Sequence, residues 1–225
     1  MASIQAFGDI HGRSDWKMFI DTQFDYIVFV GDYFDNEKID GHIQISNFLE
    51  IIEFKKKFPN KLKLLIGNHD LQYLSGIDEL CTGWQENLDS AINIGLEENL
   101  KYLQPSFTFN NILFTHAGLT KSFSKRVGLN LRYIDKSLQT LFDKNRQAFQ
   151  LIGDSINGDT VEQSPCWVRP GPLLNDKLDG INQVVGHTKQ ETIQLINGCA
   201  FIDIQGMPME MLNCATFDWD DIYSF

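Results

Sequence analysis

Residues 64–71 read LLIGNHDL, an apolar run that ends abruptly in a glycine and three polar side chains. The run Leu62–Ile66 is typical of a buried strand, and Gly67 with Asn68 would be sufficient to form an ordinary turn after it. A functional interpretation therefore requires the same pattern elsewhere in the chain.

The pattern recurs at the ends of four other apolar runs. These runs cover residues 3–7, 26–30, 111–114 and 183–185, and the motifs after them are GDIHG (8–12), GDYFD (31–35), THAG (115–118) and GHT (186–188). In layered α/β folds, functional groups collect beyond the carboxyl ends of strands, and glycine there lets the backbone approach a ligand. Of the five histidines, four lie in these motifs, which favours a shared ligand role: His11, His69, His116 and His187.

The side chains at the five strand ends have the chemistry of a metal site. Histidine nitrogen combined with carboxylate and amide oxygen suits zinc, manganese or iron better than calcium. Six candidate ligands are too many for one four-coordinate ion but suit two ions about 3.5–4 Å apart. Asp32 lies in the middle of the set and is expected to bridge the two ions. Such a pair lowers the pKa of a shared water and neutralises the oxygens of a phosphoryl group.

Composition limits the classes of protein that remain. At 225 residues the chain has the length of one α/β domain, and its 43% hydrophobic content is ample for a core. The formal net charge of −11 argues against extended nucleic-acid binding. No signal peptide or membrane-length apolar run is visible, and the four cysteines lack metal-binding or Cys-x-x-Cys spacing. These features predict a cytoplasmic protein with reduced, buried cysteines that does not bind membranes, and they indicate no oligomeric state.

Taken together, the five motifs resemble those of the calcineurin-like metallophosphoesterases in order and in spacing, over residues 8–188. The resemblance implies an α/β fold, a four-layer αββα sandwich of two mixed β-sheets flanked by helices. It implies one domain over residues 1–225, with a helical cap insertion around 71–106 and 123–149. A helix between His42 and Phe58 should pack on a sheet through an apolar stripe: Ile45, Phe48, Leu49 and Ile52. The strands after residue 191, joined at Asn197-Gly198 and Gly206-Met207-Pro208, should complete the second sheet.

The resemblance also implies a role for each motif residue. Asp9, His11 and Asp32 would hold the first ion. The second ion would be held by Asp32 as the bridge, with Asn68, His116 and His187. His69 would protonate the leaving oxygen or stabilise the transition state, and Asp35 would orient it. Asp70 would support the loop without touching an ion.

The GHT motif indicates a branch of the superfamily. Many phosphodiesterase branches carry Gly-His-x-His, whereas Lys189 follows Thr188 here, as expected for the phosphoprotein-phosphatase branch. We therefore expect a phosphoesterase that uses in-line attack of a metal-bridging hydroxide, most like a small Ser/Thr protein phosphatase acting on a phosphoprotein. Its cofactors would be two divalent ions, with manganese expected and iron or zinc as alternatives. Hydrolysis of a nucleotide or symmetrical dinucleoside polyphosphate is the alternative activity, and a catalytically silent metal-binding interaction module is the alternative class.

One position departs from that branch. The branch normally has Gly-Asp-x-x-Asp-Arg-Gly, with an arginine that grips phosphate through two hydrogen bonds, whereas Asn36 and Glu37 stand here. Asn36 can donate a hydrogen bond to substrate but carries no charge. Arg13 and Arg169 are therefore the candidates to supply the missing charge. The departure leaves the preference for monoesters or diesters open.

Overall fold

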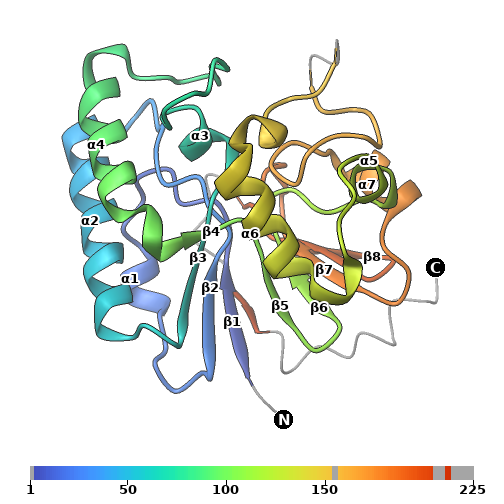
Figure 1. The fold of residues 1–225 in the computed structure, drawn as a ribbon. Helices are drawn as coiled ribbons and strands as arrows, with labels where there is room; N and C mark the ends of the chain where they lie inside the picture. Colours follow the sequence, from blue (N-terminus) through green and yellow to red (C-terminus); the bar gives the residue numbers. More distant parts are fainter. Residues whose placement is uncertain (1–2, 154–156, 205–210, 214–225) are drawn as a thin grey trace.

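Two five-stranded sheets form the centre of the molecule (Figure 1). The computed structural model describes residues 3–153, 157–204 and 211–213. The first sheet has the order β10-β1-β2-β3-β4, with strands β10 (Met211–Asn213), β1 (Ile4–Phe7), β2 (Tyr26–Phe29), β3 (Leu62–Leu65) and β4 (Leu103–Gln104). The second has the order β5-β6-β7-β9-β8, with strands β5 (Phe107–Phe109), β6 (Ile112–Phe114), β7 (Asn182–Val185), β9 (Cys199–Phe201) and β8 (Gln194–Ile196).

Both sheets are mixed. Strands β1 to β4 run parallel, and β10 pairs antiparallel with β1. In the second sheet β6, β7 and β9 run parallel, while β5 and β8 lie antiparallel at the two edges. The expectation that all the late strands complete the second sheet is wrong for β10, which extends the first sheet. Gly206-Met207-Pro208 lies outside the described residues.

The hairpin β8–β9 follows from its two turn residues. Asn197 and Gly198 connect the strands with φ of 48° and 73°. Positive φ at both central residues is the backbone that a two-residue hairpin requires, and Asn-Gly adopts it at low cost. This part of the sequence prediction is confirmed.

Helices cover the outer faces of the sheets (Figure 1). On the first sheet, α1 (Trp16–Phe19), α2 (Gly41–Lys57) and α4 (Asp89–Asn99) share one apolar cluster with β1, β2 and β3. On the second, α7 (Pro170–Asp176) packs Leu173 against Val185 and Phe201. The other helical segments are α3 (Asn68–Leu71), α5 (Lys121–Arg126), α6 (Ile134–Lys144) and the short 3₁₀ turns η1 (Glu86–Leu88), η2 (Leu100–Tyr102), η3 (Leu131–Tyr133) and η4 (Arg146–Phe149).

Alternation along the strands explains why two core layers exist. Ile4 and Ala6 of β1 join the cluster between the sheets, whereas Phe7 of the same strand faces the helices. Val28 of β2 also faces inward, and its neighbour Phe29 faces outward. Because side chains alternate across a strand, an apolar run buries both faces of a sheet at once. The expected four-layer αββα sandwich is confirmed.

The buried face of α2 differs from the expected stripe. Phe48 and Ile52 are buried, but Leu49 is 43% exposed and Ile51 is fully buried. The polar Gln44 and Asn47 share the buried face. Their amides are satisfied there, since Asn47 accepts from the Trp16 indole at 3.0 Å and Gln44 bonds to the backbone of residues 36 and 39. Hydrophobic spacing alone cannot reveal a face that is completed by tertiary hydrogen bonds.

The cysteine prediction holds for the described residues. Cys81, Cys166 and Cys199 are buried and form no disulfide. Cys214 lies outside the described residues.

Candidate metal centre

Strand register brings the five motifs to one edge of the sandwich. Phe7 pairs with Phe29, which pairs with Leu64, so β1, β2 and β3 end at the same level. In the second sheet, Phe114 pairs with Val184 at the ends of β6 and β7. The carboxyl ends of parallel strands share an edge, and the polar loops that follow them converge there.

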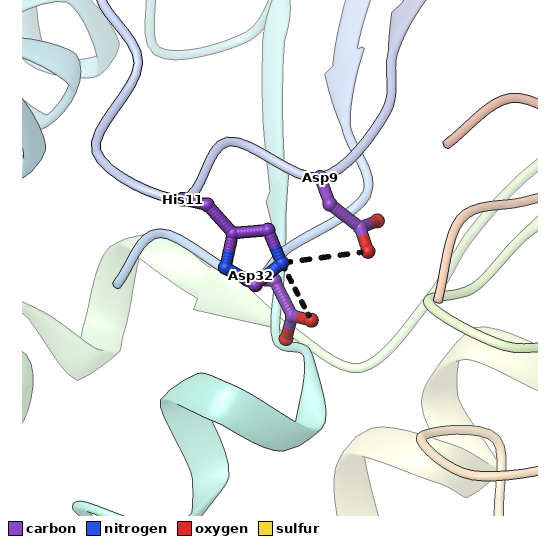
Figure 2. A group of neighbouring side chains, drawn as sticks. All are labelled: Asp9, His11 and Asp32. Atoms are coloured by element: carbon purple, nitrogen blue, oxygen red, sulfur yellow. Dashed lines mark ion pairs between the residues drawn. The ribbon is translucent and has the colours of Figure 1, made fainter. Parts of the chain in front are cut away.

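The first cluster consists of Asp9, His11 and Asp32, which point toward one another (Figure 2). Nε2 of His11 lies 3.9 Å from Oδ2 of Asp9 and 3.8 Å from Oδ2 of Asp32. One ligand atom from each residue lies within 4.8 Å of the others, so the three could hold one metal ion. Nδ1 of His11 lies 2.6 Å from the carbonyl oxygen of Phe34. That contact orients the ring so that Nε2 faces the carboxylates.

The second cluster is built around Asn68. Its Oδ1 lies 2.9 Å from Nε2 of His116 and 3.0 Å from Nδ1 of His187. Oδ2 of Asp32 lies 3.4 Å from Nε2 of His116. Asp32 therefore faces both clusters, as a bridging carboxylate would. All six expected ligands lie together.

Unusual backbone conformations hold these side chains in place. His11, Asp32 and His187 have φ of 42°, 54° and 63°, a region that costs a residue other than glycine about 1 kcal/mol or more. Backbone hydrogen bonds stabilise the arrangement, including His11 N–H to the Asp32 carbonyl at 2.7 Å. The strained backbone thus serves to orient the ligands.

Two glycines make room for the carboxylates. A Cβ atom on Gly67 would lie 2.0 Å from Oδ1 of Asp32, and one on Gly186 would lie 2.0 Å from Oδ1 of Asp9. Asp70 completes the support, because its carboxylate accepts from the backbone N–H groups of Gly67 and Asp32 at 2.9 and 2.8 Å. These contacts explain why glycine precedes the polar residues in the sequence motifs.

The charges in the cluster fit bound cations. Burial, with the nearby Asp203, holds the pKa of Asp9 well above its usual range. Asp203 is itself buried, and no described residue donates a hydrogen bond to either of its carboxylate oxygens. Buried carboxylates without a compensating charge are costly. A divalent cation at this point would remove the cost, so the donor set fits a metal centre.

The histidines lead to the same conclusion. Burial, followed by the nearby His116 and Arg169, lowers the pKa of His187 well below its usual range, which leaves a neutral imidazole suited to ligation. Although burial opposes it, the carboxylates of Asp32 and Asp9 raise the pKa of His116 to about 10. The carboxylates that raise the pKa of His116 are thus the ones whose charge a shared cation would neutralise.

His69 and Asp35 lie beside the ligands as a pair. Nδ1 of His69 is 2.8 Å from Oδ2 of Asp35, and the His69 ring meets the His11 ring edge-on with centroids 5.1 Å apart. Burial lowers the pKa of His69, but Asp32 and Asp35 outweigh it and raise the pKa above its usual value. The pair therefore favours a protonated imidazole at the edge of the cluster.

A cleft of about 400 Å³ opens beside these residues. It is lined by His11, Arg13, Asp35, Asn36, Glu37, Lys38, His69, Thr82, Gly83 and Lys189. Two residues of the segment expected to form a helical cap, Thr82 and Gly83, line this cleft. The main helix of that segment, α4, packs along α2 instead. The cap interpretation, and the role of residues 123–149 in it, stays a prediction.

The three expected substrate-binding residues have other hydrogen-bond partners. Each guanidinium nitrogen of Arg13 donates to a backbone carbonyl, those of Ile10, Ile204 and Asp9. Arg169 donates to the carbonyl of Asn157 and, at 3.2 Å, to Oγ1 of Thr188. Oδ1 of Asn36 accepts from the N–H of Lys38 at 2.9 Å. These bonds favour positioning roles, and substrate contact by these residues stays a prediction.

Sequence reasoning missed Asp203, Lys38 and Lys189. Asp203 follows β9 by two residues, so it repeats the strand-end pattern, but no glycine or histidine marks it. The lysines lie next to motifs without belonging to one. A search for all charged residues within three positions of a motif would have found both.

Comparison with known proteins assigns the family. A family model described as calcineurin-like phosphoesterase matches residues 3–196. The chain belongs to this family. As a calcineurin-like phosphoesterase it carries all five motifs directly after strands, at one edge of the sandwich, which supports a hydrolase with a metal centre.

Individual relatives are distant. A probable serine/threonine-protein phosphatase of Encephalitozoon cuniculi is 29% identical over 125 residues, which cover 52% of this chain and 26% of the relative. The chain thus spans about a quarter of that protein's length. A cold-active protein tyrosine phosphatase structure matches with a TM-score of 0.64 at 20% identity, over 95% of this chain and 73% of the other. A Saccharomyces cerevisiae protein serine/threonine phosphatase matches with a TM-score of 0.57 at 17% identity, over 90% and 67%. These structures share the fold.

Among the described residues, no helix has both the length and the apolar character needed to cross a membrane.

Proposed function

We propose that this calcineurin-like phosphoesterase hydrolyses phosphate monoesters with two bound divalent ions, as a small protein phosphatase would. The observation that supports it most is the position of Asp32 between two clusters. Asp32 lies 3.8 Å from His11 on one side and 3.4 Å from His116 on the other. Two ions held in this way would lower the pKa of a water and neutralise phosphoryl oxygens.

The chain's own residues then have distinct tasks. Asp9, His11 and Asp32 would hold one ion, and Asp32, Asn68, His116 and His187 the other. His69 would donate its proton to the leaving oxygen of the ester, because it lines the cleft and its pKa is raised. Asp35 would hold His69 in that orientation through the 2.8 Å contact with Nδ1.

A substrate panel tests the proposal. Purified protein would be incubated with manganese, zinc or iron(II) and assayed with p-nitrophenyl phosphate, phosphoserine and phosphotyrosine peptides, and diadenosine tetraphosphate. We expect manganese-dependent release of phosphate from the first substrate and from at least one peptide. Preferential cleavage of diadenosine tetraphosphate would instead identify the protein as a dinucleoside polyphosphate hydrolase. Bound metal without hydrolysis of any ester would contradict the proposal and favour a silent metal-binding module.

A further inference from the structure

Arginine supplies little of the positive charge that a phosphate dianion would need in this cleft. Asn36 stands where related motifs carry arginine. All three guanidinium nitrogens of Arg13 donate to backbone carbonyls, and Nε and one terminal nitrogen of Arg169 donate to oxygens of the chain. Glu37 adds a negative charge to the cleft wall. Some other cation has to offset it if an anionic substrate binds there.

Two lysines in the cleft are available for this role. Lys38 and Lys189 are both exposed, and both line the same cleft as His11 and His69. No described residue forms an ion pair or hydrogen bond with either ammonium group. Among the described residues, the exposed Lys125 and Lys136 are unpaired as well, so what distinguishes Lys38 and Lys189 is their place in the cleft beside His11 and His69. The two cleft lysines therefore keep their donors for a ligand.

Hydrogen bonds anchor the chain around each lysine. The N–H of Lys38 donates to Oδ1 of Asn36 at 2.9 Å, and Gln44 binds the backbone of Asn36. Lys189 follows His187, whose N–H donates to Asp9 at 3.0 Å. After it, the N–H of Gln190 donates to the carbonyl of Asp203 at 2.8 Å. Both lysines thus extend from anchored loops, one after β2 and one after β7.

We propose that Lys38 and Lys189 together bind the non-bridging oxygens of a phosphate monoester dianion. The inference rests on the proposed function and specifies its substrate class. Lysine carries the same single charge as arginine, as a point charge on a flexible stem without the planar guanidinium. Two lysines together therefore match the two negative charges of a phosphate dianion. A monoester dianion gains more from two positive charges than a diester monoanion does. Asn36 then acts by fixing the turn that presents Lys38.

Binding of orthophosphate tests this directly. Manganese-loaded wild-type protein and the variants Lys38→Ala, Lys189→Ala and the double variant would be titrated with orthophosphate by calorimetry. Lys125→Ala is the matched control, because Lys125 is an exposed lysine on α5 that does not line the cleft. We expect the dissociation constant to rise about threefold in each single variant and about tenfold or more in the double variant, as for partly exposed charge pairs. The control should match the wild type.

Kinetics provide a second readout. In the double variant, the KM for p-nitrophenyl phosphate should rise by a larger factor than kcat falls, and the monoester preference over bis-p-nitrophenyl phosphate should shrink. A variant with arginine at both positions should bind phosphate about as tightly as the wild type, unlike the double alanine variant. Unchanged phosphate affinity and unchanged ester preference in the double variant would overturn the inference, as would a wild-type protein that binds no orthophosphate.

The two proposals fail in different ways. A wild-type protein that turns over esters while the lysine variants behave like Lys125→Ala retains the proposed function and loses the lysine subsite. A protein that hydrolyses no ester but binds orthophosphate through both lysines retains the subsite and loses the proposed function.

Discussion

Asp35 lies between His69 and Tyr73 and binds both. Its Oδ2 is 2.8 Å from Nδ1 of His69, and its Oδ1 accepts a hydrogen bond from the Tyr73 hydroxyl at 2.5 Å. The side chain is buried, and Gln72 donates to it as well. Gln85 adds a longer contact of 3.4 Å to Oδ1. Partners that all follow β3 in the chain thus hold the carboxylate and fix the direction of the His69 ring.

Replacing His69 should separate chemistry from metal binding. His69→Ala is expected to lower kcat for p-nitrophenyl phosphate by about 10² to 10⁴, the usual contribution of general acid catalysis. Metal content, measured on the same sample by atomic emission, should stay at the wild-type value. Equal turnover by the variant would remove His69 from the mechanism.

Replacing Asp35 should have a smaller effect on the same step. Asp35→Asn keeps the shape but removes the charge that helps raise the pKa of His69. The variant should therefore lose the proton of His69 at a lower pH than the wild type. The alkaline limb of its pH–kcat profile should shift to lower pH. A profile that superimposes on the wild type would show that Asp35 does not act through His69.

Two glycine replacements should have opposite effects on stability. Gly67→Ala would place a Cβ atom 2.0 Å from Oδ1 of Asp32 and 2.7 Å from its backbone nitrogen. We expect a loss of about 1–3 kcal/mol in the free energy of unfolding and weaker manganese binding. Gly95→Ala is the control, because a Cβ atom at that position of α4 would have open space around it. It should stabilise the protein by about 0.5–1 kcal/mol. Urea unfolding measures both, and a stabilising Gly67→Ala would contradict the close approach.

The half-buried Glu79 should make stability depend on pH. Burial raises the pKa of Glu79, although hydrogen bonds from Leu151 N–H and the Trp167 indole at 3.0 Å partly oppose the rise. Between the unfolded carboxyl pKa of about 4.3 and the raised folded value, the folded state binds more protons than the unfolded state. Stability contributed by this group is therefore present at low pH and falls as pH rises through that window.

The Glu79→Gln variant isolates this contribution. The unfolding free energy of the wild type minus that of the variant should decrease as pH rises from about 4 and become flat above the folded pKa. Urea titrations at half-unit intervals of pH measure the unfolding free energy of both proteins. The contributions of the other titratable groups are common to the two and drop out of the difference. A difference that increases with pH would show that the hydrogen bonds outweigh burial.

The buried Cys199 should react slowly with alkylating agents. Burial raises its pKa to about 11 although Lys177 acts against it. Because only the thiolate reacts, a rise from about 8.5 lowers the thiolate fraction at pH 8 by roughly 200-fold. Mass spectrometry after brief iodoacetamide treatment should find Cys199 modified in the denatured protein and unmodified in the native one. Rapid native modification would contradict its buried placement.

The strand ends were predictable because their signal is local. An apolar run, a glycine and a polar ligand within eight residues, as in LLIGNHDL, are visible without any tertiary information. Their convergence was not local, since His116 and His187 lie 48 and 119 positions from Asn68 in the chain. The resemblance to a family provided that step, and the register of the parallel strands explains it.

Other features depend on tertiary contacts that leave no mark in the sequence. Gln44 is buried on α2 because the loop after β2 offers it hydrogen bonds, so the helix face is rotated away from Leu49. The sequence predicted Arg13 as a phosphate ligand and did not single out Lys189. Only the folded chain shows that backbone carbonyls occupy the guanidinium of Arg13 while the ammonium of Lys189 is free of partners among the described residues.

The contact between Asp9 and the backbone of His187 joins positions 178 residues apart. Ribosomes extend a chain by about 5–20 residues per second, so the aspartate emerges roughly 9 to 36 s before its partner is made. During that interval the second cluster, which includes His187, is incomplete on the nascent polypeptide. The last ligand of the dinuclear site is therefore supplied only when synthesis reaches residue 187, so capture of both ions by the full set follows synthesis of most of the chain.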